Sequence, residues 1–108
     1  MDRFASEQRS LANWLALHHT PGVGPATFAR LLKQFDSLEL LFSEPKRAEG
    51  ISARTQSALL NPDWDRVEQD LTWFSESDRH IITLHDPRYP ELLKQISDPP
   101  SLLFVQGD

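Results

Sequence analysis

Two stretches of apolar residues at helical spacing flank a short break rich in glycine and proline. The pattern predicts a first helix over about residues 5–18 and a second over residues 25–35. Pro25 suits the first position of a helix, because the N–H that it lacks would have no partner there. The apolar positions of the two helices are Leu11, Trp14, Leu15 and Leu17, followed by Phe28, Leu31, Leu32 and Phe35.

Three further helices are predicted before residue 78. Ser37 is a suitable N-cap for a short helix that Pro45 ends, and residues 46–50 form a loop. Ser52 is placed to cap a fourth helix ending near Leu60. Asn61-Pro62-Asp63 then interrupts the chain before a fifth helix, whose apolar face is formed by Trp64, Val67, Leu71 and Phe74. Residues 1–78 are therefore expected to form a compact five-helix bundle.

The pattern changes at residue 79. Residues 79–84 are β-branched and apolar between polar flanks, which predicts a buried strand. A turn-rich segment, a helical turn or two within residues 91–96 and a break at 98–100 precede a second strand over 102–105. Because these elements cannot bury both faces of a sheet, we expect residues 79–108 to open an α/β domain that extends beyond Asp108. The predicted fold class is mainly α.

Composition narrows the possible functions. The chain of 108 residues has a net charge of −5 and no cysteine, which excludes disulfides and cysteine-based metal sites or nucleophiles. The acidic residues lie mostly in residues 61–108, and residues 1–60 are close to neutral. Neither half has the basic stripe that supplies most non-specific DNA affinity, so any contact with a nucleic-acid backbone is expected to be weak.

Several classes of protein are disfavoured by missing motifs. No apolar run is long enough for a membrane span, and the N-terminus has no signal-peptide core, so a cytoplasmic location without membrane partners is expected. No P-loop, dinucleotide-binding glycine motif or nucleophile elbow occurs in the sequence. We therefore expect no cofactor, no metal and no catalytic residues.

The turn Pro21-Gly22-Val23-Gly24 carries the strongest indication of chemistry. Glycines allow a positive φ and close approach of the backbone to a ligand, and the helix that follows directs free N–H groups and a positive dipole end outward. These properties predict a phosphate seat of the helix-hairpin-helix type; the alternative is a tight turn that only joins two packed helices. The candidate phosphate-binding residues are Gly22, Val23, Gly24, Thr27, Arg30 and Lys33.

Four other features have a structural and a functional interpretation. Gly50-Ile51-Ser52 resembles a degenerate second hairpin, for which a structural role is favoured because the second glycine is missing. His18 and His19 suit the C-terminal end of the first helix dipole. His80, His85 and Asp86 suggest a metal site or an acid–base pair, but more ligands would be needed. Trp73 lies off the apolar face of its helix and is the candidate residue for a partner surface.

The segment after the first strand resembles a known family. Residues 86–100 and 102–107 are similar to the pattern D-x-x-Y-P-x-x-L…I-x-D-x-P…L-x-x-x-G with which DNA-processing proteins of the DprA/Smf family enter their Rossmann-like domain. Residues 17–35 resemble the N-terminal helical domain of that family, which is SAM-like and related to helix-hairpin-helix folds. The resemblance covers nearly the whole chain.

The resemblance implies a non-enzymatic role in bacterial natural transformation. Proteins of this family bind incoming single-stranded DNA, protect it and load the RecA recombinase on it. Their main DNA site, their dimer interface and their RecA contacts are associated with the Rossmann-like domain. The resemblance therefore implies an accessory helical domain at 1–78 and the first segment of a Rossmann-like domain at 79–108, with single-stranded DNA, RecA and a second copy as partners of the intact protein.

Two alternatives remain from the residues themselves. The near-neutral helical region and Trp73 also suit a module for protein contacts or self-association without DNA binding. An enzyme that uses His80, His85 and Asp86 would need a pocket with affinity for a metal or a phosphate.

Overall fold

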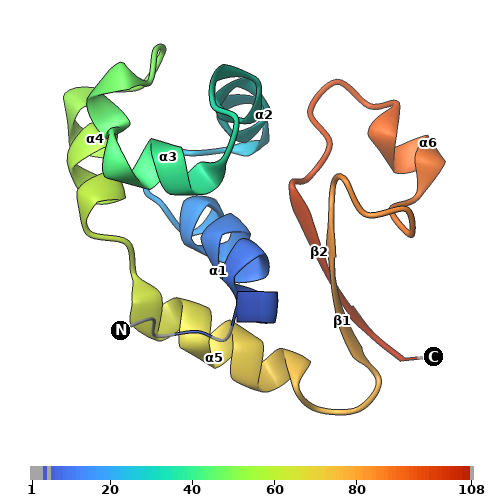
Figure 1. Ribbon diagram of the computed structural model, residues 1–108. Helices are drawn as coiled ribbons and strands as arrows, with labels where there is room; N and C mark the ends of the chain where they lie inside the picture. Colours follow the sequence, from blue (N-terminus) through green and yellow to red (C-terminus); the bar gives the residue numbers. More distant parts are fainter. Residues whose placement is uncertain (1–3, 5, 108) are drawn as a thin grey trace.

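In the computed structural model, residue 4 and residues 6–107 are described, and they form helices followed by a small β-ribbon (Figure 1). The α-helices are α1 (Ser6–His18), α2 (Pro25–Gln34), α3 (Leu38–Ser43), α4 (Ala53–Leu60), α5 (Trp64–Phe74) and α6 (Glu91–Lys94). The strands are β1 (Arg79–Thr83) and β2 (Leu102–Gln106). The mainly α class is therefore confirmed, and the start of the first predicted helix, at residue 5, lies outside the described residues.

Polar side chains cap the N-termini of three of the helices, and two of these caps, Ser37 and Ser52, were predicted. The hydroxyl of Ser37 accepts a hydrogen bond from the N–H of Leu40 at α3, and that of Ser52 accepts one from the N–H of Thr55 at α4. The carboxylate of Asp63 caps α5 in the same manner through Arg66 N–H. Each cap pairs a backbone donor that the helix itself leaves free.

The core lies around α1, which runs through the middle of the helices in Figure 1. Leu15, Ala16 and Leu17 are fully buried, and so are Phe28 and Leu31 of α2. Leu41, Leu59 and Val67 bring α3, α4 and α5 to the same cluster. The apolar stripes read from the sequence thus converge on one core.

β1 and β2 pair as an antiparallel ribbon in which Ile81 is opposite Phe104. Opposite residues share a face, so Ile81, Leu102 and Phe104 are on one face, which turns toward the helices. Ile81 and Leu102 are buried, and the Phe104 ring lies 6.0 Å from His18 and 5.8 Å from Trp73, between ring centroids. The ribbon therefore packs on the end of α1 and on α5.

Some predicted boundaries were wrong. A loop was expected from residue 46, but Pro45–Arg47 form a short 3-10 helix. The helix forms because Pro45 fixes its own φ and its carbonyl accepts a hydrogen bond from the N–H of Ala48. The helix predicted within 91–96 has only four residues, and β2 extends to Gln106.

Among the described residues, no helix is long and apolar enough to cross a bilayer.

Candidate nucleic-acid interface

The Pro-Gly-Val-Gly turn connects α1 to α2 and is held by its own hydrogen bonds. Thr20 donates from its hydroxyl to the carbonyl of Ala16, and the N–H of Val23 donates to the carbonyl of Thr20. Gly22 has a φ of +86°, which a residue with a side chain rarely adopts. Val23 is half-buried and packs against the core, as its place between the glycines predicts.

The N-terminus of α2 is open to a ligand. Gly24 occupies the N-cap position, no side chain caps the helix there, and a Cβ added at Gly24 would meet nothing within 4 Å. Gly24, Pro25 and Ala26 are exposed. The N–H groups of the first turn have no partner within their own helix, so an anion is the natural ligand of this end.

A second turn of the same form precedes α4. Gly50 has a φ of +83°, the half-buried Ile51 packs against the core, and Ser52 caps the helix. Both turns thus consist of a glycine with positive φ, an apolar residue and an N-cap residue, followed at once by a helix. They differ at the cap, because Ser52 uses its own hydroxyl where Gly24 leaves the helix end uncapped.

The two turns contact each other's helices. A Cβ added at Gly22 would lie 2.3 Å from Oγ1 of Thr55, and that hydroxyl donates to the carbonyl of Pro21 over 3.2 Å. A Cβ added at Gly50 would lie 3.3 Å from a guanidinium nitrogen of Arg30 in α2. Each glycine therefore faces the helix that follows the other turn.

A pair of hydrogen bonds fixes this arrangement. The side-chain amide of Gln34 donates to the carbonyl of Glu49 over 3.0 Å and accepts from the N–H of Glu49 over 2.8 Å. The end of α2 is thereby tied to the residue before the second turn. The two turns consequently form one unit, which we call the paired hairpins (residues 20–24 and 49–52).

The candidate cations are unevenly placed. Arg30 is exposed, donates to the hydroxyl of Thr27 over 3.1 Å and lies beside Gly50, so it stands at the paired hairpins. Arg54, in the first turn of α4, is also exposed. Lys33 lies in the last turn of α2, about 12 Å from Pro25 along a helix axis at 1.5 Å per residue. The fold brings Thr27 and Arg30 to the hairpin and leaves Lys33 at the far end of the helix.

The histidines have structural contacts. The His19 imidazole contacts the carboxylate of Asp70 over 2.5 Å. His18 packs between His19 and Phe104, and burial, followed by the neighbouring His19, lowers its pKa from the usual value. In the part of the chain that is described, no group of three or more histidine, aspartate or glutamate side chains is arranged to hold a metal.

Asp86 belongs to a turn. Its carboxylate accepts hydrogen bonds from the backbone N–H of Arg88 over 2.9 Å and from the guanidinium of the same residue over 2.8 Å. These bonds lower its pKa to about 2. The Tyr89 ring that follows is buried, and its hydroxyl donates to the carbonyl of Pro100 over 2.7 Å. Asp86 and Tyr89 thereby shape the connection between the two strands.

Trp73 is half-buried against the ribbon. The guanidinium carbon of Arg79 lies 5.3 Å from the centroid of its ring, and Phe104 packs edge-on against it. These contacts within the chain account for an aromatic residue off the apolar face of α5. Trp73 stays a candidate for a partner surface only through the part of its ring that remains accessible.

The second turn was predicted only as a degenerate hairpin, and Thr55 was not among the predicted site residues. The signal was the spacing, since Gly50 precedes its helix by three residues, as Gly22 does. The partner of Gly22 is 33 residues away in the chain, and periodicity within one helix carries no information on such a contact.

Known proteins share both the helix-hairpin-helix region and most of the remaining chain. The family described as the DprA-like N-terminal HHH domain matches residues 7–41, which run from the second residue of α1 through the first turn and α2 into α3. The chain is similar to Protein Smf of Synechocystis sp. (strain ATCC 27184 / PCC 6803 / Kazusa), with 32% identity over 106 residues. That alignment covers 89% of this chain and 25% of the relative, so the chain spans about a quarter of the length of that protein. No solved structure matches the chain significantly. On the matched helix-hairpin-helix region and the similarity to Protein Smf, the chain belongs to the DprA/Smf family of DNA-processing proteins.

Proposed function

We propose that the paired hairpins bind the phosphate backbone of single-stranded DNA and that the chain serves as an accessory domain of a recombination mediator. The first hairpin is the main seat, because the N-terminus of α2 is exposed and uncapped. The second hairpin supports it and places Arg30 and Arg54 nearby. The exposed and uncapped N-terminus of α2 at Gly24 is the single observation that carries this proposal.

The distribution of charge determines how strongly this chain is expected to bind DNA. Helix dipoles and one or two cations act on a neighbouring phosphate over a short range and are screened by salt. Residues 61–108 are acidic and repel a polyanion. Binding by this chain is therefore weak, independent of sequence and sensitive to salt.

The role of the whole protein forms part of the same proposal. We assign to it the protection of incoming single-stranded DNA in the cytoplasm and the loading of RecA, with a homodimer as the working form and no catalysed reaction. Residues 1–78 are its helical domain, and residues 79–108 begin its Rossmann-like domain. The DNA-processing family and the helix-hairpin-helix region support this assignment.

Fluorescence anisotropy of a labelled single-stranded oligonucleotide at low and physiological salt tests the phosphate seat. The variant Gly24→Glu places a carboxylate at the open end of α2 without a steric conflict, and Gly24→Gln is its neutral control. We expect salt-sensitive binding that is lost in Gly24→Glu and kept in Gly24→Gln. Equal binding by the two variants would contradict the seat.

The same titration addresses the alternative of a module for protein contacts. Leu60 is 58% exposed at the end of α4 and lines a cavity of about 470 Å³ between the 3-10 helix and α4, where it would anchor a protein partner. If no oligonucleotide binds even at low salt, the paired hairpins are structural and this second function is favoured.

A further inference from the structure

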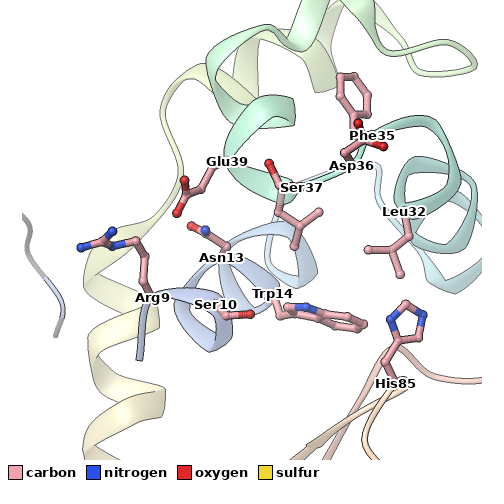
Figure 2. Close-up of a pocket in the computed structure, with 11 residues that line it drawn as sticks. Arg9, Ser10, Asn13, Trp14, Leu32, Phe35, Asp36, Ser37, Glu39 and His85 are labelled. Atoms are coloured by element: carbon pink, nitrogen blue, oxygen red, sulfur yellow. The ribbon is translucent and has the colours of Figure 1, made fainter. Parts of the chain in front are cut away.

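A cavity of about 450 Å³ opens at the opposite end of α2 from the first hairpin (Figure 2). It lies between α1, the turn from α2 to α3, and His85 in the connection that follows β1. The helices and the connection between the two strands both contribute to its wall. Nothing in the proposed phosphate contacts uses this cavity.

One end of the cavity is apolar and aromatic. The Trp14 ring packs on Phe28 with centroids 5.0 Å apart, and His85 stands edge-on against it at 5.3 Å. Leu32 lies above His85 in Figure 2 and is half-buried. His85 is exposed, whereas Trp14 lines the cavity with only 9% of its surface exposed, so a flat ring that enters packs on the imidazole and meets only the rim of Trp14.

The remaining wall is mixed, because Phe35 and Leu38 are apolar and the other side chains that line it are polar. Asp36 and Glu39 carry exposed carboxylates, and Asn13 contributes a side-chain amide. In Figure 2, Arg9 and Ser10 lie on the side of Glu39 and Asn13, and Asp36 lies apart from them beside Phe35. With two carboxylates and one guanidinium in the lining, the cavity disfavours a phosphate and favours a neutral ligand that donates hydrogen bonds.

We infer that this cavity binds a nucleobase with an exocyclic amino group, namely adenine, cytosine or guanine. A base offers a planar face to the aromatic end and amino hydrogens to the carboxylates and to Asn13. The inference rests on the proposed function, in which the paired hairpins hold the backbone of the same strand. α2 has ten residues and is about 15 Å long, a span that a few nucleotides can bridge.

Nucleosides separate this inference from the phosphate seat, because they carry no phosphate. The ¹⁵N-labelled chain is titrated with cytidine and, in parallel, with uridine, which presents a carbonyl oxygen where cytidine presents an amino group. The indole N–H signal of Trp14 is assigned with the variants Trp64→Phe and Trp73→Phe. We expect cytidine to shift this signal and the side-chain amide of Asn13, with an affinity at least about fivefold above that of uridine.

Two variants and a control locate the binding. Glu39→Ala and His85→Ala should each weaken cytidine binding about fivefold or more, because they remove an acceptor and the exposed ring. Glu76→Ala removes the same charge from an exposed position outside the cavity and should leave binding unchanged. Gly24→Glu should also leave cytidine binding unchanged, whereas it abolishes oligonucleotide binding.

The outcomes of the two experiments are independent. Equal shifts with cytidine and uridine, shifts outside the cavity, or no shift at all would overturn the base site and leave the phosphate seat intact. Cytidine binding without oligonucleotide binding would refute the seat and support the cavity as a site for free nucleosides.

Discussion

At the scale of single residues, Gly22 shows how a missing side chain joins two hairpins. Its φ of +86° and its contact with Thr55 leave no room for a methyl group. Gly24, two residues on, has ordinary extended geometry and open space around it. The two glycines of the motif therefore have different roles: Gly22 packs the fold, and Gly24 keeps a helix end open.

We predict that Gly22→Ala lowers the free energy of unfolding by about 2–3 kcal/mol. The loss is expected because alanine is strained in the left-handed backbone at position 22 and its methyl group overlaps Thr55. Urea denaturation measures this loss. Gly24→Ser is the matched control and should be neutral or stabilising by up to about 1 kcal/mol, since serine is a preferred N-cap. An alanine at position 22 that leaves stability unchanged would contradict the packing seen here.

At the scale of elements, the second hairpin depends on the cap of α4. The Ser52 hydroxyl accepts from the N–H of Thr55 and donates to its Oγ1 over 3.1 Å, and that oxygen in turn donates to the carbonyl of Pro21. A chain of three polar groups thus connects the start of α4 to the turn before α2.

Ser52→Ala should lower the free energy of unfolding by about 1 kcal/mol, because the N–H of Thr55 loses its partner. The control is Ser57→Ala, an exposed change on the same helix, for which helix propensity predicts no loss. Thermal denaturation of the two variants distinguishes the cap from a general effect of removing a hydroxyl. If Ser52→Ala and Ser57→Ala had the same denaturation midpoint, the cap would contribute nothing to stability.

The elements themselves were largely predictable, and the reason is local. The helix starts at Pro25, Ala53 and Trp64 follow from capping residues and proline, which act within one turn of the chain. The 3-10 helix at Pro45–Arg47 was missed because such short turns have no periodic pattern of apolar residues. The antiparallel register of the ribbon is set by a connection of 18 residues and was not predicted.

At the scale of the whole molecule, the helices and the ribbon meet around His18 and Phe104. His18 ends α1, contacts Phe104 of β2 and lies near Asp70 and Arg66 of α5, so its surroundings exist only in the assembled fold. Burial and the adjacent His19 lower its pKa, while Asp70 acts in the opposite direction and Arg66 in the same one. The folded chain therefore prefers a neutral His18.

This preference predicts that stability falls as pH decreases through about 6.5. The unfolded state binds a proton near the ordinary histidine pKa, and the folded state binds it only at lower pH, so protonation favours unfolding. Urea unfolding between pH 7 and pH 5 should show this decrease, and His18→Gln should reduce it. His85→Gln, at an exposed histidine, is the control and should retain the slope. A pH dependence that is identical in His18→Gln would contradict the assignment to His18.

The sequence by itself determined the helices, their caps, the phosphate-type turn at residues 21–24 and the resemblance to the DprA/Smf family, because each depends on residues close together in the chain. The tertiary structure decided that Gly22 faces Thr55, that Gly50 faces Arg30, that Lys33 stands apart from the hairpins, and that Trp14 and His85 enclose one cavity. These relations join segments far apart in the sequence. They arise from the packing of several helix faces onto one core, which no local pattern of hydrophobic and polar positions encodes.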